Sequence, residues 1–251
     1  MRKEEVRDLS VVTHLRTSHA KVVEQLGLAI VGGDFDIGET LPGDVDLEQR
    51  FDVSRSVLRE AMKTLAAKGL VIAKSRVGTR VTERCHWDML DEDVLRWHFE
   101  SGVTREFIDQ LYDIRLVLEP ATAAFAAASA TAEDCAELRG YAMLLGSPDL
   151  SWRDQAVADL RFHIYLTLVG GNLFMDSMVG FIKAALDGAF TLTYQQTGGG
   201  PRGDGIVNAH LAIVAAIEQG DQNGARIAME TVIQRGRAAA LAAIEGSSRP
   251  G

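Results

Sequence analysis

The chain has few features of secreted, disulfide-linked or membrane-embedded proteins. Its 251 residues include only two cysteines, Cys85 and Cys135, and neither lies in a C-x-x-C or zinc-finger spacing. We interpret them as buried or idle thiols rather than as a disulfide. The longest run without Asp, Glu, Lys or Arg has 14 residues, fewer than the roughly 20 of a membrane-spanning helix, and no signal peptide opens the chain. We therefore expect a cytoplasmic protein without a membrane partner.

The sequence also lacks the local signatures of common enzyme classes. It contains no nucleophile elbow, no H-E-x-x-H, no paired E-x-x-H motifs as in di-iron bundles, and no Gly-rich phosphate loop placed after a strand. The single Glu83-x-x-His86 is interpreted as a chance occurrence. These absences favour a binding protein over an enzyme.

Charge is distributed unevenly along a chain whose formal net charge is -9 and whose hydrophobic content is 47%. Residues 1–85 carry 14 basic and 13 acidic side chains, whereas residues 86–251 carry 12 and 22. Within the first part, residues 50–84 hold nine Lys or Arg against three acids, a local net charge of +6. A basic island within an acidic protein indicates phosphate binding. The length permits two domains, and we expect the first to meet nucleic acid.

The basic island contains a segment with the pattern of a recognition helix. From Phe51 to Leu70 the sequence reads F-D-V-S-R-S-V-L-R-E-A-M-K-T-L-A-A-K-G-L, with Ser54 placed as the N-cap and Gly69 placed to end the helix. At 3.6 residues per turn one side is apolar and the other is cationic. The apolar side comprises Val57, Leu58, Ala61, Met62 and Leu65, and the cationic side comprises Arg55, Arg59 and Lys63. The alternative is an ordinary surface helix with solvated arginines.

The flanking segments complete a winged helix-turn-helix. A helix is predicted from about Thr17 to residue 33, followed by a turn-rich connector over Asp34–Pro42 and a short helix over Val45–Phe51. After Gly69 the pattern through Val81 predicts a β-hairpin wing. Recognition helices meet the major groove with their N-terminal residues. The predicted DNA contacts are therefore Ser54, Arg55, Ser56, Arg59 and Lys63 on the helix and Lys74, Arg76, Gly78 and Arg80 on the wing.

Together these residues resemble the winged helix-turn-helix of GntR-family transcriptional regulators. The resemblance rests on Gly38-x-x-Leu41-Pro42, on Phe51-x-Val53-Ser54-Arg55-Ser56-Val57-Leu58-Arg59-Glu60-Ala61, and on Leu47, Leu65 and Gly69-Leu70. Two positions depart from the usual pattern. Pro42-Gly43-Asp44-Val45 replaces the signature that enters the second helix, and Arg76 stands where the wing often has glycine. The resemblance implies a module over residues 14–84 that binds double-stranded DNA.

Beyond the wing the pattern is helical. Residues 85–98 are predicted to be a linker that ends in the start of a helix, where Trp87 and Trp97 either pack in a core, which is favoured, or pin the wing to the next domain. Residues 99–246 are expected to form an antiparallel bundle of six to seven helices, broken most clearly at Gln195–Asp204. Residues 1–13 are polar and charged, and we expect a loose lead-in there.

Three side chains of the expected bundle have the chemistry of a metal site. Asp159 and His163 are four residues apart and therefore share one helix face, and His210 opens another predicted helix. A carboxylate and two imidazoles can bind a metal ion, although on spacing alone a hydrogen-bonded structural pair is more common. A helical metallohydrolase that uses the same three residues is the alternative function.

The C-terminal part resembles the effector-binding FCD domain of the FadR-type branch of the GntR family. It does so through Arg115-x-x-x-Glu119-Pro120-x-x-Ala123, Asp159-x-x-x-His163, Gly171-Asn172 and His210-x-x-Ile213-x-x-Ala216-Ile217-x-x-Gly220-Asp221. Many members of that branch bind a divalent metal through an Asp, a His four residues later and two further His. The position of the last His is occupied by Val232 in this chain. The resemblance implies three ligands, Asp159, His163 and His210, and nitrogen donors favour Zn²⁺ or Ni²⁺. Water or an effector carboxylate would fill an open position.

Arg115 is the candidate anion-binding residue. It lies among apolar side chains, and Glu119 at i+4 offers one partner. In the resembled family this arginine lies near the ligand pocket, where its planar fork suits a carboxylate, and the stretch around Trp87 is similar to galactonate-operon repressors. The resemblance thus implies a transcriptional repressor of a catabolic operon that senses a sugar acid or other carboxylate through Arg115, Asp159, His163 and His210. It would bind a palindromic operator as a homodimer.

Overall fold

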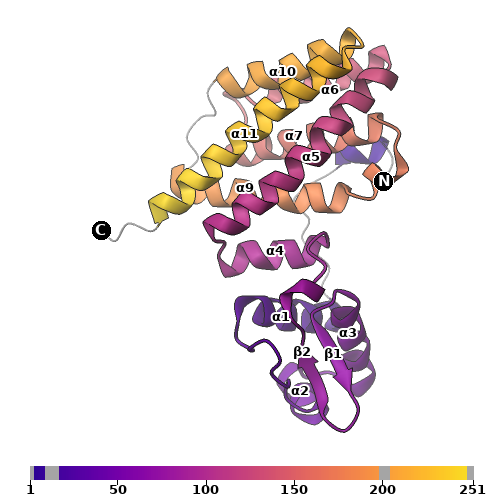
Figure 1. The fold of residues 1–251 in the computed structure, drawn as a ribbon, viewed down its shortest axis with the longest axis vertical. Helices are drawn as coiled ribbons and strands as arrows, with labels where there is room; N and C mark the ends of the chain where they lie inside the picture. The colour runs from indigo at the N-terminus through magenta and orange to yellow at the C-terminus, as the bar shows by residue number, and fades with distance from the viewer. Residues whose placement is uncertain (1–2, 9–16, 198–203, 248–251) are drawn as a thin grey trace. The chain divides into compact units, whose positions relative to one another are not determined.

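The chain forms two compact units in the computed structural model, which describes residues 3–8, 17–197 and 204–247 (Figure 1). The first, called the N-terminal unit, is Thr13–Gly102, and the second, called the helical unit, is Val103–Gly251 together with Met1–Val12. Helices dominate both units, which confirms the mostly α-helical fold predicted from the sequence.

The N-terminal unit is a winged helix-turn-helix followed by one more helix. Its described elements are α1 (Ser18–Gly32), α2 (Asp44–Phe51), α3 (Arg55–Ala67), β1 (Val71–Lys74), β2 (Gly78–Val81), the 3-10 helix η2 (Arg84–His86) and α4 (Glu92–Ser101). β1 and β2 pair antiparallel with Val71 opposite Val81. Thr17 caps α1, and Gly33 ends it with a φ of +86°. The predicted order of three helices and a hairpin wing is confirmed.

α3 begins and ends at the residues that the sequence predicts. The Ser54 hydroxyl accepts a hydrogen bond from the Val57 amide, one of the N–H groups that a helix start leaves without an intrahelical partner. At the other end Gly69 has a φ of +78°, a left-handed conformation that glycine adopts without strain. A β-carbon added to Gly69 would lie 1.9 Å from the His86 carbonyl oxygen. Glycine is therefore required here both for backbone conformation and for space.

Gly69→Ala is expected to destabilise the N-terminal unit by more than the ~1–2 kcal/mol that a left-handed alanine costs, because the added methyl also forces the backbone at His86 to shift. Gly33→Ala is the matched control, since Gly33 has a similar φ of +86° but nothing within 4 Å of an added β-carbon. Denaturant unfolding followed by circular dichroism measures both losses. Equal losses in the two variants would contradict the predicted clash.

The core of the N-terminal unit continues past the wing into α4. Trp87 and Trp97 are 6% and 0% exposed, and both belong to the buried cluster that contains the apolar residues of α1 and α3. Trp97 lies against Gly27, where an added β-carbon would be 2.3 Å from the indole ring. Core packing of the two tryptophans is thus confirmed. The predicted start of a helix within residues 85–98 is confirmed, since α4 begins at Glu92. The linker part of that prediction is wrong, because these residues complete the core of a unit that extends to Gly102.

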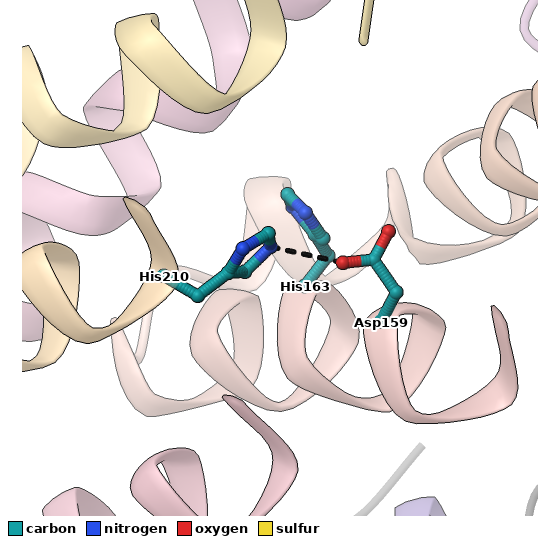
Figure 2. Close-up of side chains that lie close together, drawn as sticks. All are labelled: Asp159, His163 and His210. Carbon is teal, nitrogen blue, oxygen red and sulfur yellow. Dashed lines mark ion pairs between the residues drawn. The ribbon is translucent and has the colours of Figure 1, made fainter. Parts of the chain in front are cut away.

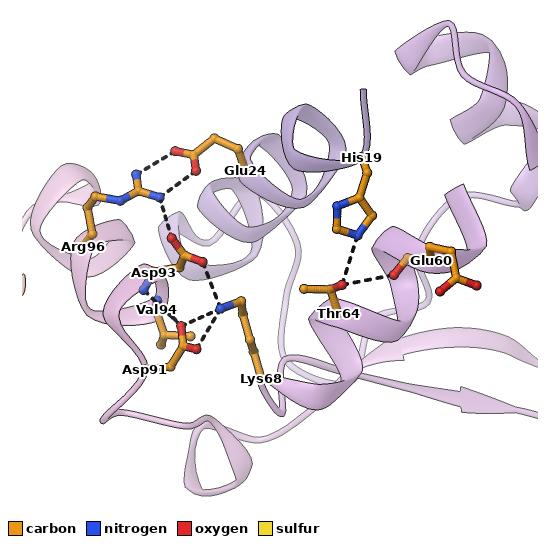
Figure 3. A network of polar contacts seen from close by, with 9 residues as sticks. All are labelled: His19, Glu24, Glu60, Thr64, Lys68, Asp91, Asp93, Val94 and Arg96. Carbon is orange, nitrogen blue, oxygen red and sulfur yellow. Dashed lines mark hydrogen bonds and ion pairs between the residues drawn. The ribbon is translucent and has the colours of Figure 1, made fainter. Parts of the chain in front are cut away.

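An ion-pair network fixes α4 to α1 and to the end of α3 (Figure 3). Lys68 Nζ lies 2.7 Å from Asp91 Oδ1 and 2.9 Å from Asp93 Oδ2. Arg96 extends the network, with its Nη2 2.6 Å from Glu24 Oε2 on α1 and 3.1 Å from Asp93 Oδ1. Charges that have lost water are stable only with their partners present. The network therefore makes α4 part of the winged module rather than a connection leading away from it.

His98 on α4 is expected to make the stability of the N-terminal unit depend on pH. Burial, with a smaller contribution from Arg84, lowers the pKa of His98 from 6.5 to about 4. Between these values the unfolded state binds a proton that the folded state does not, so the free energy of unfolding falls as the pH falls from about 6.5 to about 4. We expect the urea midpoint to decline over this range and His98→Asn to reduce the decline. If the urea midpoint of His98→Asn fell with pH as much as that of the wild type, the pH dependence would come from another titratable group.

The helical unit contains seven α-helices within its described residues. They are α5 (Arg105–Ser129), α6 (Ala132–Leu144), α7 (Trp152–Val169), α8 (Leu173–Asp176), α9 (Val179–Thr197), α10 (Asp204–Glu218) and α11 (Gln222–Ser247). α5 and α11 lie side by side and run in opposite directions (Figure 1), and α7 packs against α5, α6 and α9. This is the antiparallel bundle predicted from the sequence. Most of the predicted break at Gln195–Asp204 lies outside the described residues.

None of the helices in the described part of the chain combines the length and the apolar character needed to cross a membrane.

The segment Lys3–Asp8, the 3-10 helix η1, packs on the helical unit although it precedes the N-terminal unit in the chain. Val6 is fully buried, and Lys3 Nζ lies 2.8 Å from Asp134 Oδ1 of α6. Arg7 donates two hydrogen bonds to Glu137, from Nε at 2.9 Å and from Nη2 at 2.8 Å. The predicted loose lead-in is wrong for these six residues, because an apolar anchor and two ion pairs hold them on α6 and α7.

Candidate DNA-binding face and metal-ligand cluster

The cationic side of α3 is open to solvent. All five predicted contacts on this helix are exposed: Ser54, Arg55, Ser56, Arg59 and Lys63. Lys63 Nζ pairs with Glu60 Oε1 at 2.8 Å, whereas none of the ion pairs between described residues involves Arg55 or Arg59. The two guanidinium groups at the start of α3 are therefore placed to meet an external anion, and their role as DNA contacts stays a prediction.

The wing carries the second group of predicted contacts. Lys74, Arg76 and Gly78 are exposed, and the turn between the strands closes where the Val77 amide donates to the Lys74 carbonyl at 3.1 Å. Arg76 has a φ of +62°, which lies in the left-handed region that residues other than glycine rarely adopt. The geometry of this turn explains why glycine suits the position, and in this chain the turn presents a cation instead.

Arg80 differs from these wing residues in having an intramolecular hydrogen-bond acceptor. Its guanidinium donates to the Gly38 carbonyl oxygen through Nε at 2.7 Å and also through Nη2, and the side chain is half-buried. These hydrogen bonds give Arg80 an intramolecular acceptor, and its availability for phosphates stays a prediction. They also hold the connector between α1 and α2 against the wing.

In the helical unit, α7 and α10 bring the three predicted metal ligands together (Figure 2). Asp159 and His163 lie one turn apart on α7, and His210 reaches them from α10. One ligand atom from each lies within 4.8 Å of the others, and the three residues are 5%, 1% and 0% exposed. A buried carboxylate that converges with two imidazoles is a donor set suited to a divalent transition metal.

The hydrogen bonding of His210 decides which ring nitrogen faces the cluster. Nδ1 lies 2.9 Å from the Ile206 carbonyl oxygen, and because a carbonyl only accepts, the neutral ring carries its proton on Nδ1. Nε2 is buried, makes no hydrogen bond, and lies 2.9 Å from Asp159 Oδ1 (Figure 2). Two electron-rich atoms at this distance require a cation between them, either a proton or a metal ion. The residues present therefore fit a metal.

Glu119 of α5 connects His163 to Arg115. Its Oε2 lies 2.6 Å from His163 Nδ1, and its Oε1 accepts a hydrogen bond from Arg115 Nε at 2.6 Å. Burial would raise the pKa of Glu119, but Arg115 and His163 outweigh it and lower the pKa to about 2. The pair of Arg115 with Glu119 was predicted from their i+4 spacing. The contact with His163 was not, because no spacing rule joins residues on two different helices.

Two further residues were predicted to take part in the site, Arg115 and the residue at the fourth ligand position. The Arg115 guanidinium also lies 4.8 Å from the centre of the Tyr112 ring, so its intramolecular partners are established while its role with a carboxylate effector stays a prediction. Val232, at the fourth ligand position of the resembled pattern, lies half-buried on α11 and has no metal-binding atom. An open groove on the same helix has other lining residues: Ile227, Glu230, Thr231, Gln234, Arg235 and Ala238.

Comparison with known proteins identifies both units. The family described as "Bacterial regulatory proteins, gntR family" matches residues 19–81, and the family described as "FCD domain" matches residues 110–235. The chain is 30% identical over 217 residues to the HTH-type transcriptional regulator YieP of Escherichia coli strain K12, which covers 85% of this chain and 91% of that protein. It is 29% identical over 215 residues to the galactonate operon transcriptional repressor of the same strain, covering 85% and 92%.

Solved structures agree on the fold. Lar of Listeria monocytogenes aligns with a TM-score of 0.60 at 18% identity, covering 91% of this chain and 98% of that one. McbR/YncC of E. coli aligns with a TM-score of 0.51 at 17% identity, covering 89% and 97%. None of these relatives supports the alternative of a helical metallohydrolase, since the family consists of transcriptional regulators. With a winged helix-turn-helix in its N-terminal unit and an FCD domain in its helical unit, the chain belongs to the GntR family of bacterial transcriptional regulators.

Proposed function

We propose that this GntR-family regulator is a ligand-responsive repressor, which binds operator DNA through α3 and the wing and senses a small carboxylate beside a divalent metal in its helical unit. The observation that carries the proposal is the cluster of Asp159, His163 and His210. Three metal-binding side chains converge there from two helices within a buried region. A carboxylate with two imidazoles is a donor set suited to a divalent transition metal, which supports a site that binds an ion.

The DNA-binding part of the proposal rests on the exposed cationic side of α3. Arg55 and Arg59 are exposed near the N-terminus of the helix, the part of a recognition helix that reads the major groove. Ser54, Ser56, Lys63, Lys74, Arg76 and Gly78 complete the proposed contact set. Closed two-fold symmetry is the commonest arrangement of soluble oligomers. We propose a homodimer that places two copies of α3 on a palindromic operator, about one helical turn apart.

The sensing part of the proposal assigns Asp159, His163 and His210 as ligands of one Zn²⁺ or Ni²⁺ ion. When bound, the ion supplies a positive charge that attracts a carboxylate, and three protein ligands leave room for an oxygen of that carboxylate or for water. Arg115 offers a second cationic partner from α5, with a planar fork that suits a carboxylate. One relative is the galactonate operon repressor, which favours a sugar acid as the effector. To regulate, the effector must bind the DNA-competent and DNA-incompetent arrangements with different affinity.

Metal analysis and a ligand screen test the proposal. The purified protein is expected to bind about one Zn²⁺ or Ni²⁺ per chain, and His210→Ala is expected to remove the ion. A screen of sugar acids and dicarboxylates is expected to find one that raises the melting temperature, because a ligand of the native state stabilises it. Arg115→Lys keeps a cation beside Glu119 but loses the planar fork, and should weaken that shift. If the protein took up no metal and no carboxylate raised its melting temperature, the sensing part of the proposal would be refuted.

A further inference from the structure

We infer that Glu119 positions His163 for metal binding, by holding the proton of His163 on Nδ1 and so leaving Nε2 free to coordinate. This inference rests on the proposed metal site and concerns a residue outside the three ligands. Its starting point is the contact between α5 and α7, in which Glu119 Oε2 lies 2.6 Å from His163 Nδ1.

The chemistry follows from which atoms are already engaged. A histidine nitrogen that lies 2.6 Å from a carboxylate oxygen is placed to donate a hydrogen bond to it, and a nitrogen that carries a proton cannot also present a lone pair to a metal ion. The coordinating atom of His163 must then be Nε2. In the present structure Nδ1 is close to Oε2 without hydrogen-bond alignment. Coordination through Nε2 would set the plane of the ring and bring the N–H group into line with Glu119.

The position of Glu119 is itself fixed. Its other oxygen, Oε1, accepts a hydrogen bond from Arg115 Nε at 2.6 Å, and Glu119 and Arg115 are 1% and 3% exposed. A carboxylate that served only to neutralise Arg115 would gain most by giving both oxygens to the guanidinium. Here the oxygens are divided between the arginine and the histidine. Arg115 therefore fixes the orientation of the Glu119 carboxylate, and Glu119 in turn fixes the orientation of the His163 ring.

His210 provides an internal comparison for this arrangement. Its Nδ1 donates to the Ile206 carbonyl oxygen at 2.9 Å, so that Nε2 faces Asp159. Both imidazoles of the cluster thus have an oxygen acceptor beside Nδ1, one from its own helix and one from a neighbouring helix. Such outer partners are common for histidines that bind metals, and removing one typically weakens metal affinity about 10–100-fold.

The test measures Zn²⁺ affinity by chelator competition on the full chain, with Glu119→Gln as the variant. The amide has nearly the same shape but no charge, so we expect binding to weaken about 10–100-fold. Asp134→Asn is the matched control, since Asp134 is another buried carboxylate of the helical unit, held by Lys3 and Tyr165. We expect its Zn²⁺ affinity to stay at the wild-type value even if its melting temperature falls.

The outcomes separate this inference from the proposed function. Wild-type protein that takes up no Zn²⁺ would refute the metal site and the inference together. Zn²⁺ binding that is equally tight in wild type and Glu119→Gln would overturn the inference alone. If Glu119→Gln does not fold, ¹⁵N NMR of the Zn²⁺-loaded wild type decides the question. We expect a proton on Nδ1 of His163 and the metal on Nε2, and the opposite assignment would overturn the inference.

Discussion

Replacing Arg55 and Arg59 together with alanine is expected to weaken operator binding about 10²–10³-fold, because each guanidinium contact to a base or phosphate contributes ~1–3 kcal/mol. Both side chains are exposed on the cationic side of α3, so the double variant should retain the fold. The dependence of affinity on salt should also become shallower, since fewer counterions are released on binding. Fluorescence anisotropy with DNA from upstream of the protein's own coding region, over a range of salt concentrations, measures both effects.

A matched control separates these contacts from net charge. Arg105→Ala with Arg139→Ala removes the same two positive charges from the exposed surface of the helical unit, where each arginine pairs with a glutamate. Surface pairs of this kind contribute little to stability, and this control should bind operator DNA as the wild type does. Equal losses of affinity in the two double variants would mean that only long-range charge matters. The assignment of α3 as the recognition helix would then be wrong.

A fragment of residues 17–84 is expected to be unfolded, whereas a fragment of residues 17–102 is expected to fold. The shorter fragment ends at the wing and lacks Trp87, Val94 and Trp97, which are 6%, 0% and 0% exposed in the core of the N-terminal unit. Losing two buried tryptophans and a valine costs roughly 8–12 kcal/mol on the scale of large-to-small core substitutions. This loss is comparable to the entire stability of a small domain, ~5–15 kcal/mol.

Far-UV circular dichroism and the dispersion of amide NMR signals distinguish the two outcomes. The shorter fragment also lacks Asp91 and Asp93, so Lys68 would lose both partners at the end of α3. A point variant supplies the control, since Trp97→Ala in the longer fragment should reduce stability by ~3–5 kcal/mol without removing any backbone. If residues 17–84 alone gave a cooperative unfolding transition, α4 would be an appendage and not part of the core.

The features that could be predicted from the sequence depend on residues that are close together in the chain. Ser54 and Gly69 mark the ends of α3 through contacts within a few residues, and the apolar spacing of Leu58 and Leu65 places them in the core. These features were predicted because helix capping and periodicity depend on the neighbouring sequence alone. The gathering of Asp159, His163 and His210 was predicted through resemblance, since spacing can align the first two residues on one helix but not bring in the third.

The features that were missed all depend on contacts between distant segments. Trp97 packs against Gly27 of α1, which moves the end of the N-terminal unit from the predicted residue 84 to Gly102. Arg7 reaches Glu137 across 130 positions of the chain, so that a polar segment becomes part of the helical unit. Periodicity carries no information about such pairs. The hydrogen bond from Arg80 to the Gly38 carbonyl was missed for the same reason, because Gly38 lies in a separate loop.

The most direct test is the affinity of the full chain for DNA from its own upstream region, measured at low salt with Zn²⁺-loaded protein, with and without a panel of sugar acids and dicarboxylates. We predict tight, salt-sensitive binding and at least one carboxylate that changes the affinity about tenfold or more, an effect that should disappear in His210→Ala. Absence of DNA binding under all of these conditions would contradict the account. Tight DNA binding that no carboxylate alters would support the DNA-binding part of the proposal and refute the sensing part.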